Sequence, residues 1–171
     1  MDSSNLLPFL TGGLVATSIA ALFFRSQTRS PNPFKTIPTK TNQPQSMAGK
    51  VVVVTGASSG IGEVASQKFK DAGWEVYSGA RRIEKMKVLE ARGIHALNLD
   101  VRSDESMKDC VDKILSKEGR IDALVNNAGY GSYGSLEDVA MQEARHQFEV
   151  NIFGLARLTQ LVLKSMRERG Q

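Results

Sequence analysis

The chain has 171 residues, of which 41% are apolar and 23% charged, a composition typical of globular proteins rather than disordered or collagen-like ones. Its single cysteine, Cys110, excludes an internal disulfide and a multi-cysteine zinc site. The net charge is +4; subtracting the five basic and one acidic side chains of residues 1–50 from the totals of 22 and 18 leaves 17 of each. Residues 51–171 are therefore neutral overall, and we expect no nucleic-acid partner.

Residues 1–25 are predicted to be a membrane anchor or a targeting segment. The stretch 6–24 is uncharged and would rise about 28 Å as an apolar helix, close to the thickness of a bilayer. For an uncleaved anchor, Arg25 and Arg29 after the stretch place the body in the cytosol by the positive-inside rule, and the endoplasmic reticulum is the expected membrane. The alternatives are an organelle transit peptide, a secretory signal, and a cytoplasmic form that starts at Met47.

Two further regions follow this segment. Residues 26–49 hold four of the five prolines together with Ser, Thr, Asn and Gln, and are predicted to be a disordered linker. Residues 50–171 alternate predicted strands at 51–54, 74–78, 94–99 and 121–125 with predicted helices at 61–72, 83–92, from 103 onward, and 141–169. Such alternation implies parallel strands joined by right-handed crossovers in a doubly wound α/β layer.

Each predicted helix has an apolar face that we expect to pack against the sheet. In chain order the faces consist of Ile61, Val64, Ala65, Phe69 and Ala72; Ile83, Met86 and Leu89; Met107, Cys110, Val111, Ile114 and Leu115; and Ala144, Phe148, Ile152, Leu155, Leu158, Val162 and Met166. Gly73 and Gly93 predict helix ends, and Ser103 predicts an amino-terminal cap.

A glycine-rich turn, Thr-Gly-Ala-Ser-Ser-Gly-Ile-Gly at 55–62, joins the first predicted strand to the first predicted helix. Its three glycines would let the backbone turn sharply and approach a pyrophosphate, whose charge would be met by free N–H groups and the helix dipole. The alternative is an ordinary strand-to-helix turn. The buried strand before it and the amphipathic helix after it favour the phosphate-binding interpretation.

Four motifs in this order resemble the short-chain dehydrogenase/reductase family: residues 55–62, Asp-Val at 100–101, Asn-Asn-Ala-Gly at 126–129 and Val-Asn-x-x-Gly at 150–154. The resemblance covers residues 50–170. It implies a Rossmann-like, doubly wound parallel sheet, here truncated after the fourth strand and the long fourth helix. It also implies an oxidoreductase that interconverts a carbonyl and an alcohol in a small molecule, with lipids and steroids among the expected substrates.

The resemblance implies roles for individual residues. Cofactor phosphates and ribose would lie against Gly56, Ser58, Ser59, Gly60, Ile61 and Gly62, adenine against Asp100 and Val101, and the rest of the cofactor near Asn126, Ala128 and Gly129. Asn151 would be the catalytic asparagine that helps to hold a water in a proton relay. The alternatives are a strand-end cap for Asp100 and a polar gap in an apolar helix face for Asn151.

The charge after the second predicted strand distinguishes the two nicotinamide cofactors. An acid there would bind the adenosine ribose of NAD and repel the 2′-phosphate of NADP. This sequence has Ala80 followed by Arg81 and Arg82, with no acid before Glu84. Two guanidinium groups favour a phosphate dianion, so we expect NADP(H). The alternative is a pair of solvated surface arginines.

The family's catalytic tyrosine, which precedes a lysine by four residues, has no counterpart in these 171 residues. The fourth residue after Tyr77, Tyr130 and Tyr133 is Arg, Gly and Glu, respectively. Of the Asn, Ser, Tyr and Lys set only Asn151 is present, so we expect the chain by itself to be inactive. A second hypothesis is a catalytically inactive nucleotide-binding or interaction module.

Three expectations concern partners and metals. The long predicted helix could pair two copies in a homo-oligomer, and Tyr130 and Tyr133 would lie on a loop beside the nicotinamide. No metal site is predicted. His95 and His146 have no partners at metal-ligand or catalytic spacing, and are expected to be structural or solvated.

Overall fold

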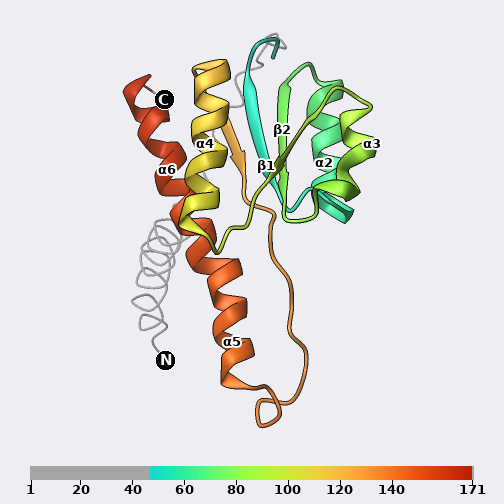
Figure 1. Cartoon of the computed structure of the whole chain (residues 1–171), viewed down its shortest axis with the longest axis vertical. Coiled ribbons are helices and arrows are strands. Elements are labelled where there is room, and N and C mark those ends of the chain that lie inside the picture. The colour runs from blue at the N-terminus through green and yellow to red at the C-terminus, as the bar shows by residue number, and fades with distance from the viewer. Residues whose placement is uncertain (1–46, 171) are drawn as a thin grey trace, which may run out of the picture. The chain divides into compact units, whose positions relative to one another are not determined.

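The computed structural model describes residues 47–170, which belong to one compact unit, Gln45–Gln171. Its parallel strands, β1 (Val51–Thr55), β2 (Glu75–Ala80), β3 (His95–Asn98) and β4 (Ala123–Val125), form one sheet in the order β3-β2-β1-β4 (Figure 1). This arrangement confirms the predicted parallel α/β sheet. β2 ends at Ala80, two residues later than predicted, and so carries Arg81 to the carboxyl edge of the sheet.

Helices cover both faces of the sheet (Figure 1). One face is covered by α2 (Gly60–Asp71), followed along the chain by a 3₁₀-helix, η1 (Ile83–Met86), and one α-helical turn, α3 (Lys87–Glu90). The other is covered by α4 (Asp104–Glu118) and α6 (Leu155–Glu168). The valines of β1 alternate between the two apolar cores, which explains why this strand is a continuous β-branched run.

The predicted apolar face of α4 is confirmed. Met107, Cys110, Val111 and Ile114 are buried, and Leu115 packs at the margin of the same core. The predicted cap is confirmed as well, because the Ser103 side chain accepts a hydrogen bond from the Ser106 N–H at 3.2 Å. Gly119 ends α4 in the left-handed conformation, with φ of 68°.

The predicted apolar face of α2 is confirmed for Ala65 and Phe69, which pack against the core, and is wrong for Ile61, Val64 and Ala72, which are exposed. Ile61 and Val64 are 81% and 54% exposed, and the side of the helix that faces the sheet carries Gly62 and Ser66. The Ser66 hydroxyl donates to the Gly62 carbonyl at 2.9 Å and accepts from the Ser78 hydroxyl of β2 at 2.7 Å. The first turns of the helix therefore approach the strands through the small residues Gly62 and Ser66, while Phe69 packs near its end, and counting apolar side chains does not detect the small residues.

The predicted long helix is present but interrupted. It consists of α5 (Met141–Phe148), a π-helical segment η2 (Glu149–Gly154) and α6. Leu158 and Val162 of α6 are buried as predicted, whereas Phe148 and Ile152 are 59% and 51% exposed. Their predicted burial fails because α5 and the start of η2 extend past the end of the sheet (Figure 1), where residues 47–170 provide no layer to pack against.

One further residue that was predicted to face the core is exposed. Ile83, expected to face inward with Met86 and Leu89, is exposed at the start of η1, whereas the other two are buried.

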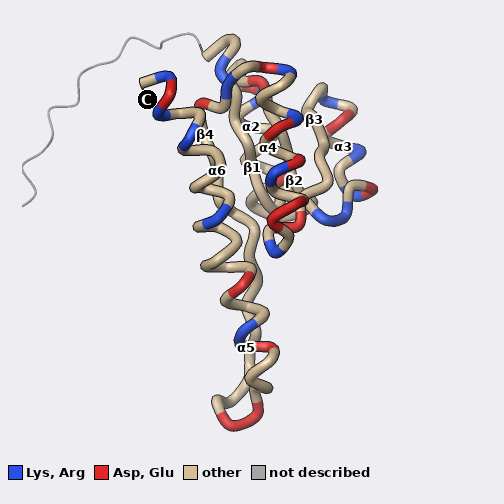
Figure 2. The backbone as a smooth tube through the Cα atoms, turned by 60° about the vertical axis from the view of Figure 1, so that its left-hand side comes forward, with Lys and Arg blue, Asp and Glu red and all other residues tan. Residues whose placement is uncertain are grey.

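Basic and acidic residues are interspersed along the described backbone (Figure 2). The predicted membrane-spanning stretch 6–24 lies outside the described residues, and within 47–170 no helix has the length and apolarity needed to cross a bilayer.

Candidate functional site

A pocket lies at the carboxyl edge of the sheet, where the loops after β1, β2, β3 and β4 meet. Nine of the predicted site residues line it: Gly56, Ser58, Ser59, Arg81, Arg82, Asp100, Val101, Ala128 and Gly129. Four other residues that were not among the predicted cofactor contacts also line it: Ala80, Leu99, Tyr130 and Val150. Gly60, Ile61, Gly62, Asn126 and Asn151 are not among the lining residues, and their proposed contacts with a cofactor stay predictions.

Two glycines of the turn are required by the close approach of neighbouring backbone. Gly56 has φ of 66°, and a Cβ atom there would lie 2.8 Å from the Ala128 Cα. A Cβ atom on Gly62 would lie 2.5 Å from the Asn127 Nδ2 and 2.6 Å from the Gly56 carbonyl oxygen. The glycines thus bring α2, the turn and the loop after β4 together, and the pocket forms beside this contact.

A side-chain clasp joins the ends of β1 and β4 below the pocket. The Thr55 hydroxyl accepts hydrogen bonds from the N–H groups of Asn127 and Ala128, at 3.0 and 2.9 Å. In return the Asn127 Nδ2 donates to the Thr55 carbonyl at 2.9 Å. Thr55 and Asn127 stand in the quoted motifs but were not among the predicted site residues, since bonds between residues 72 positions apart leave no local pattern.

Asn151 holds the loop that carries Tyr130. Its Oδ1 accepts a hydrogen bond from the Tyr130 N–H at 3.1 Å, and its Nδ2 donates one to the Tyr130 carbonyl at 2.8 Å. The Asn151 amide thus binds both backbone polar groups of Tyr130. The residue lies in η2, whose last residue, Gly154, packs so closely on the Val101 carbonyl that a Cβ atom would collide with it. The predicted proton-relay role of Asn151 stays a prediction.

Asn126 also makes a contact away from the pocket lining. Its Nδ2 donates to the Thr159 hydroxyl of α6 at 2.9 Å, which ties the end of β4 to that helix. Asn126 therefore links the end of β4 to α6, whereas the Thr55 hydrogen bonds link the same loop to β1.

Arginine neutralises the one carboxylate among the described lining residues. Asp100 receives hydrogen bonds from the Arg102 side chain at 2.7 and 3.1 Å, and its Oδ1 also accepts from the Arg102 N–H at 3.0 Å, as a strand-end cap would. The hydrogen bond from Arg102 holds the pKa of Asp100 below its usual range, and the positive charge of Arg81 acts in the same direction. Arg81 and Arg82 thus leave the pocket with a net positive charge.

Tyr130 and His146 form a polar chain at the edge of the pocket. The Tyr130 hydroxyl donates to the Glu143 carboxylate at 3.0 Å and lies 2.9 Å from the His146 Nδ1, while Arg102 reaches the His146 Nε2 at 2.6 Å. These hydrogen bonds agree with the structural role expected for His146, and its partners come from the loop after β4 and the loop after β3. Desolvation and the bond to Glu143 raise the pKa of Tyr130. Tyr133 is exposed.

Comparisons with known proteins agree with this geometry. The family model described as short chain dehydrogenase matches residues 50–171. The chain is 39% identical over 134 residues to human retinol dehydrogenase 8, covering 72% of this chain and 42% of that protein. It is 34% identical over 122 residues to the 3-ketodihydrosphingosine reductase of Bacteroides thetaiotaomicron, covering 71% and 44%. The chain thus spans less than half the length of these curated relatives.

A solved structure extends the comparison to three dimensions. The crystal structure of a metagenomic short-chain oxidoreductase in complex with NADP superimposes with a TM-score of 0.68 and 32% sequence identity. The match covers 73% of this chain and 60% of that one.

Proposed function

The chain belongs to the short-chain dehydrogenase family, and from this premise we propose that it binds NADP(H) as part of an oxidoreductase interconverting a carbonyl and an alcohol. The observation that carries the proposal is the charge of the pocket. Arg81 and Arg82 line it without a competing acid, because Asp100 is already paired with Arg102. A 2′-phosphate dianion is the part of NADP(H) that such a pair of guanidinium groups favours.

The glycine-rich turn fits the pyrophosphate of the same cofactor. Ser59, at the N-cap of α2, makes no side-chain hydrogen bond to the helix, so the first N–H groups of α2 stay available to an anion. Gly56 lines the pocket where a larger residue would collide with Ala128. Short side chains and free backbone donors are what a phosphate cradle needs.

The bound cofactor would supply the hydride, and the proton for the alkoxide must come from a nearby acid. Tyr130 does not fit that role, because desolvation and the hydrogen bond to Glu143 raise its pKa and so make it a weaker acid. The Tyr-x-x-x-Lys pair of the family is not among these 171 residues. We therefore propose that this chain by itself binds cofactor but does not turn over a carbonyl substrate.

The names of the relatives support an apolar substrate class. One is named for retinol and another for 3-ketodihydrosphingosine, both lipids that carry the alcohol or ketone to be converted. We propose a lipid-like or steroid-like carbonyl or alcohol as the substrate class.

Membrane attachment and self-association are further proposals. Residues 1–25 would anchor the protein with its body in the cytosol, in keeping with an uncharged stretch followed by Arg25 and Arg29. The long helix would pair two copies, in keeping with the exposed Phe148, Ile152 and Phe153.

The cofactor proposal is tested by replacing Arg81. For Arg81→Gln we expect the NADPH dissociation constant to rise about tenfold or more, the equivalent of one charge-assisted hydrogen bond, while the value for NADH stays within about twofold. Fluorescence titration of the purified chain with each cofactor measures both.

The matched control is Arg92→Gln, which removes an exposed arginine paired with Asp71 on the outer surface and should leave both dissociation constants unchanged. An equal loss of NADPH and NADH affinity in Arg81→Gln would contradict a 2′-phosphate contact. Unchanged NADPH affinity would remove Arg81 from the site altogether.

A further inference from the structure

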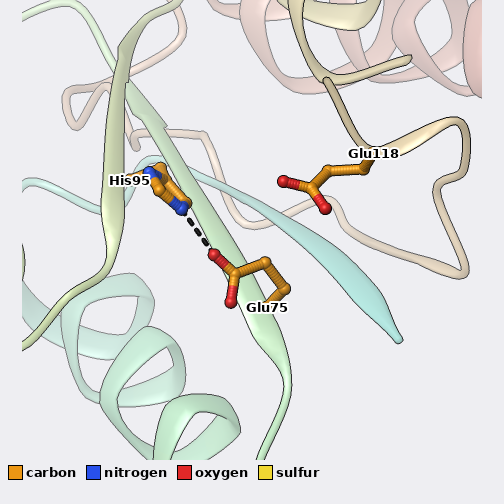
Figure 3. A group of neighbouring side chains, drawn as sticks. All are labelled: Glu75, His95 and Glu118. Atoms are coloured by element: carbon orange, nitrogen blue, oxygen red, sulfur yellow. Dashed lines mark hydrogen bonds and ion pairs between the residues drawn. The ribbon is translucent and has the colours of Figure 1, made fainter. Parts of the chain in front are cut away.

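Three side chains converge at the edge of the sheet opposite the cofactor pocket (Figure 3). Glu75 is the first residue of β2, His95 is the first residue of β3 and Glu118 is the last residue of α4. The His95 Nε2 lies 2.5 Å from the Glu75 Oε1, and one potential ligand atom from each of the three residues lies within 4.8 Å of the others. All three residues are half-buried.

His95 was expected to be structural or solvated, and its spacing along the chain does not predict this grouping. His95 follows Glu75 by 20 residues and precedes Glu118 by 23, separations at which no metal motif would be recognised. The register of the sheet and the end of α4 bring them together.

Tyr77 holds two of the three side chains in place. It pairs with His95 across β2 and β3, and the two rings stack with their centroids 4.6 Å apart. Its hydroxyl donates to the Glu118 Oε1 at 2.6 Å. Because Tyr77 is buried, the imidazole and the Glu118 carboxylate are oriented by a rigid neighbour, as the ligands of metal sites commonly are.

A lysine ammonium already lies beside these ligand atoms. The Lys117 Nζ is 3.3 Å from the His95 Nε2 and 3.7 Å from the Glu118 Oε1, and its side chain is 55% exposed. On the far side the Lys70 Nζ lies 3.5 Å from the Glu75 Oε2. The cluster therefore attracts cations, and the exposed Lys117 side chain is free to leave when another cation binds.

The geometry and chemistry of the cluster point to a metal ion, and we propose that Glu75, His95 and Glu118 bind a divalent transition-metal ion such as Zn²⁺. One imidazole nitrogen and two carboxylates form a three-ligand set that leaves a fourth tetrahedral position to water. The nitrogen ligand favours Zn²⁺ over Mg²⁺ and Ca²⁺, which prefer oxygen ligands throughout. The bound ion would link the ends of β2, β3 and α4 and displace the Lys117 ammonium.

Calorimetric titration of the tag-free chain with Zn²⁺ tests the proposal. We expect the dissociation constant for Zn²⁺ to rise by roughly 100-fold in His95→Gln and at least about tenfold in Glu118→Gln. Glu118→Gln removes the negative charge of the ligand but keeps an oxygen that can accept a hydrogen bond from the Tyr77 hydroxyl. A weaker Zn²⁺ affinity in this variant therefore reports the loss of charge and not the loss of that hydrogen bond. Mg²⁺ should bind no more weakly to His95→Gln than to the parent chain.

The matched control is His146→Gln, which removes the other histidine of the sequence and should leave Zn²⁺ affinity within about twofold of the parent value. A Zn²⁺ affinity that is unchanged in His95→Gln, or reduced as much in His146→Gln, would overturn the proposal.

Lys117→Met provides a test that does not depend on losing a ligand. Removing the competing ammonium should tighten Zn²⁺ binding by about tenfold, a gain that damage to the fold would not produce. Circular dichroism without metal shows whether each variant is folded. Unchanged or weaker Zn²⁺ binding by folded Lys117→Met would contradict a metal ion in this position.

Discussion

The helices α2 and α4 lie on opposite faces of one sheet and pack on it in different ways. α4 buries four large or medium side chains, among them Met107 and Ile114, in an apolar core. α2 fully buries only Gly62 and Ser66, packs Ala65 and Phe69 at the margin of its core, and exposes Ile61 and Val64. The helix that only covers the sheet follows the hydrophobic pattern, whereas the helix whose amino end meets the pocket needs small residues for a close approach.

The largest expected effect lies in the α4 core. Ile114→Ala removes a fully buried side chain, and we expect it to lower the free energy of unfolding by about 3 kcal/mol, because it loses apolar burial and leaves a cavity. Urea denaturation measures the loss. Cofactor affinity of the folded protein should stay within about twofold, since α4 packs away from the glycine-rich turn.

Leu115→Ala is the control for this variant, because Leu115 packs only at the margin of the core and its loss should be smaller. A cost below about 1 kcal/mol for Ile114→Ala would mean that α4 does not anchor this face of the sheet.

An intermediate effect on stability, with a larger one on binding, is expected on α2. Gly62→Ala would place a methyl group 2.5 Å from the Asn127 Nδ2, so α2 or the loop after β4 must move. We expect the free energy of unfolding to fall by about 1–3 kcal/mol. The NADPH dissociation constant should rise at least about tenfold, because the turn and the loop after β4 form the pocket together.

Gly134→Ala is the control, because its added methyl group would meet only the tip of the Val139 side chain in an exposed loop. If Gly62→Ala destabilises the protein but binds NADPH normally, the close packing of α2 serves stability alone. α2 would then contribute to the protein in the same way as α4.

The smallest effect is expected on the outer face of α2. Ile61→Ala changes a side chain that is 81% exposed, so the free energy of unfolding should change by no more than about 0.5 kcal/mol. Urea denaturation beside Ile114→Ala compares an exposed and a buried isoleucine directly. A loss of unfolding free energy above about 1 kcal/mol would mean that Ile61 packs against other residues, as helical periodicity predicts for α2.

Motifs that lie next to one another along the chain were predictable, and contacts across the fold were not. The glycine-rich turn, Asp100 and Val101 each follow a strand, so parallel pairing alone places them at one edge of the sheet. The clasp between Thr55 and Asn127 and the bond between Tyr130 and His146 depend instead on how loops from different strands meet.

Local spacing along the chain predicted the alternation of strands and helices, the α4 face and the glycine-rich turn, and the family resemblance predicted most of the other pocket residues. Three features became visible only in the fold: the burial of Gly62 and Ser66 on α2, the exposure of α5, and the proximity of Glu75, His95 and Glu118. The physical reason is that strand register and helix packing set which distant side chains come within bonding distance, and residue order along the chain does not encode these contacts locally.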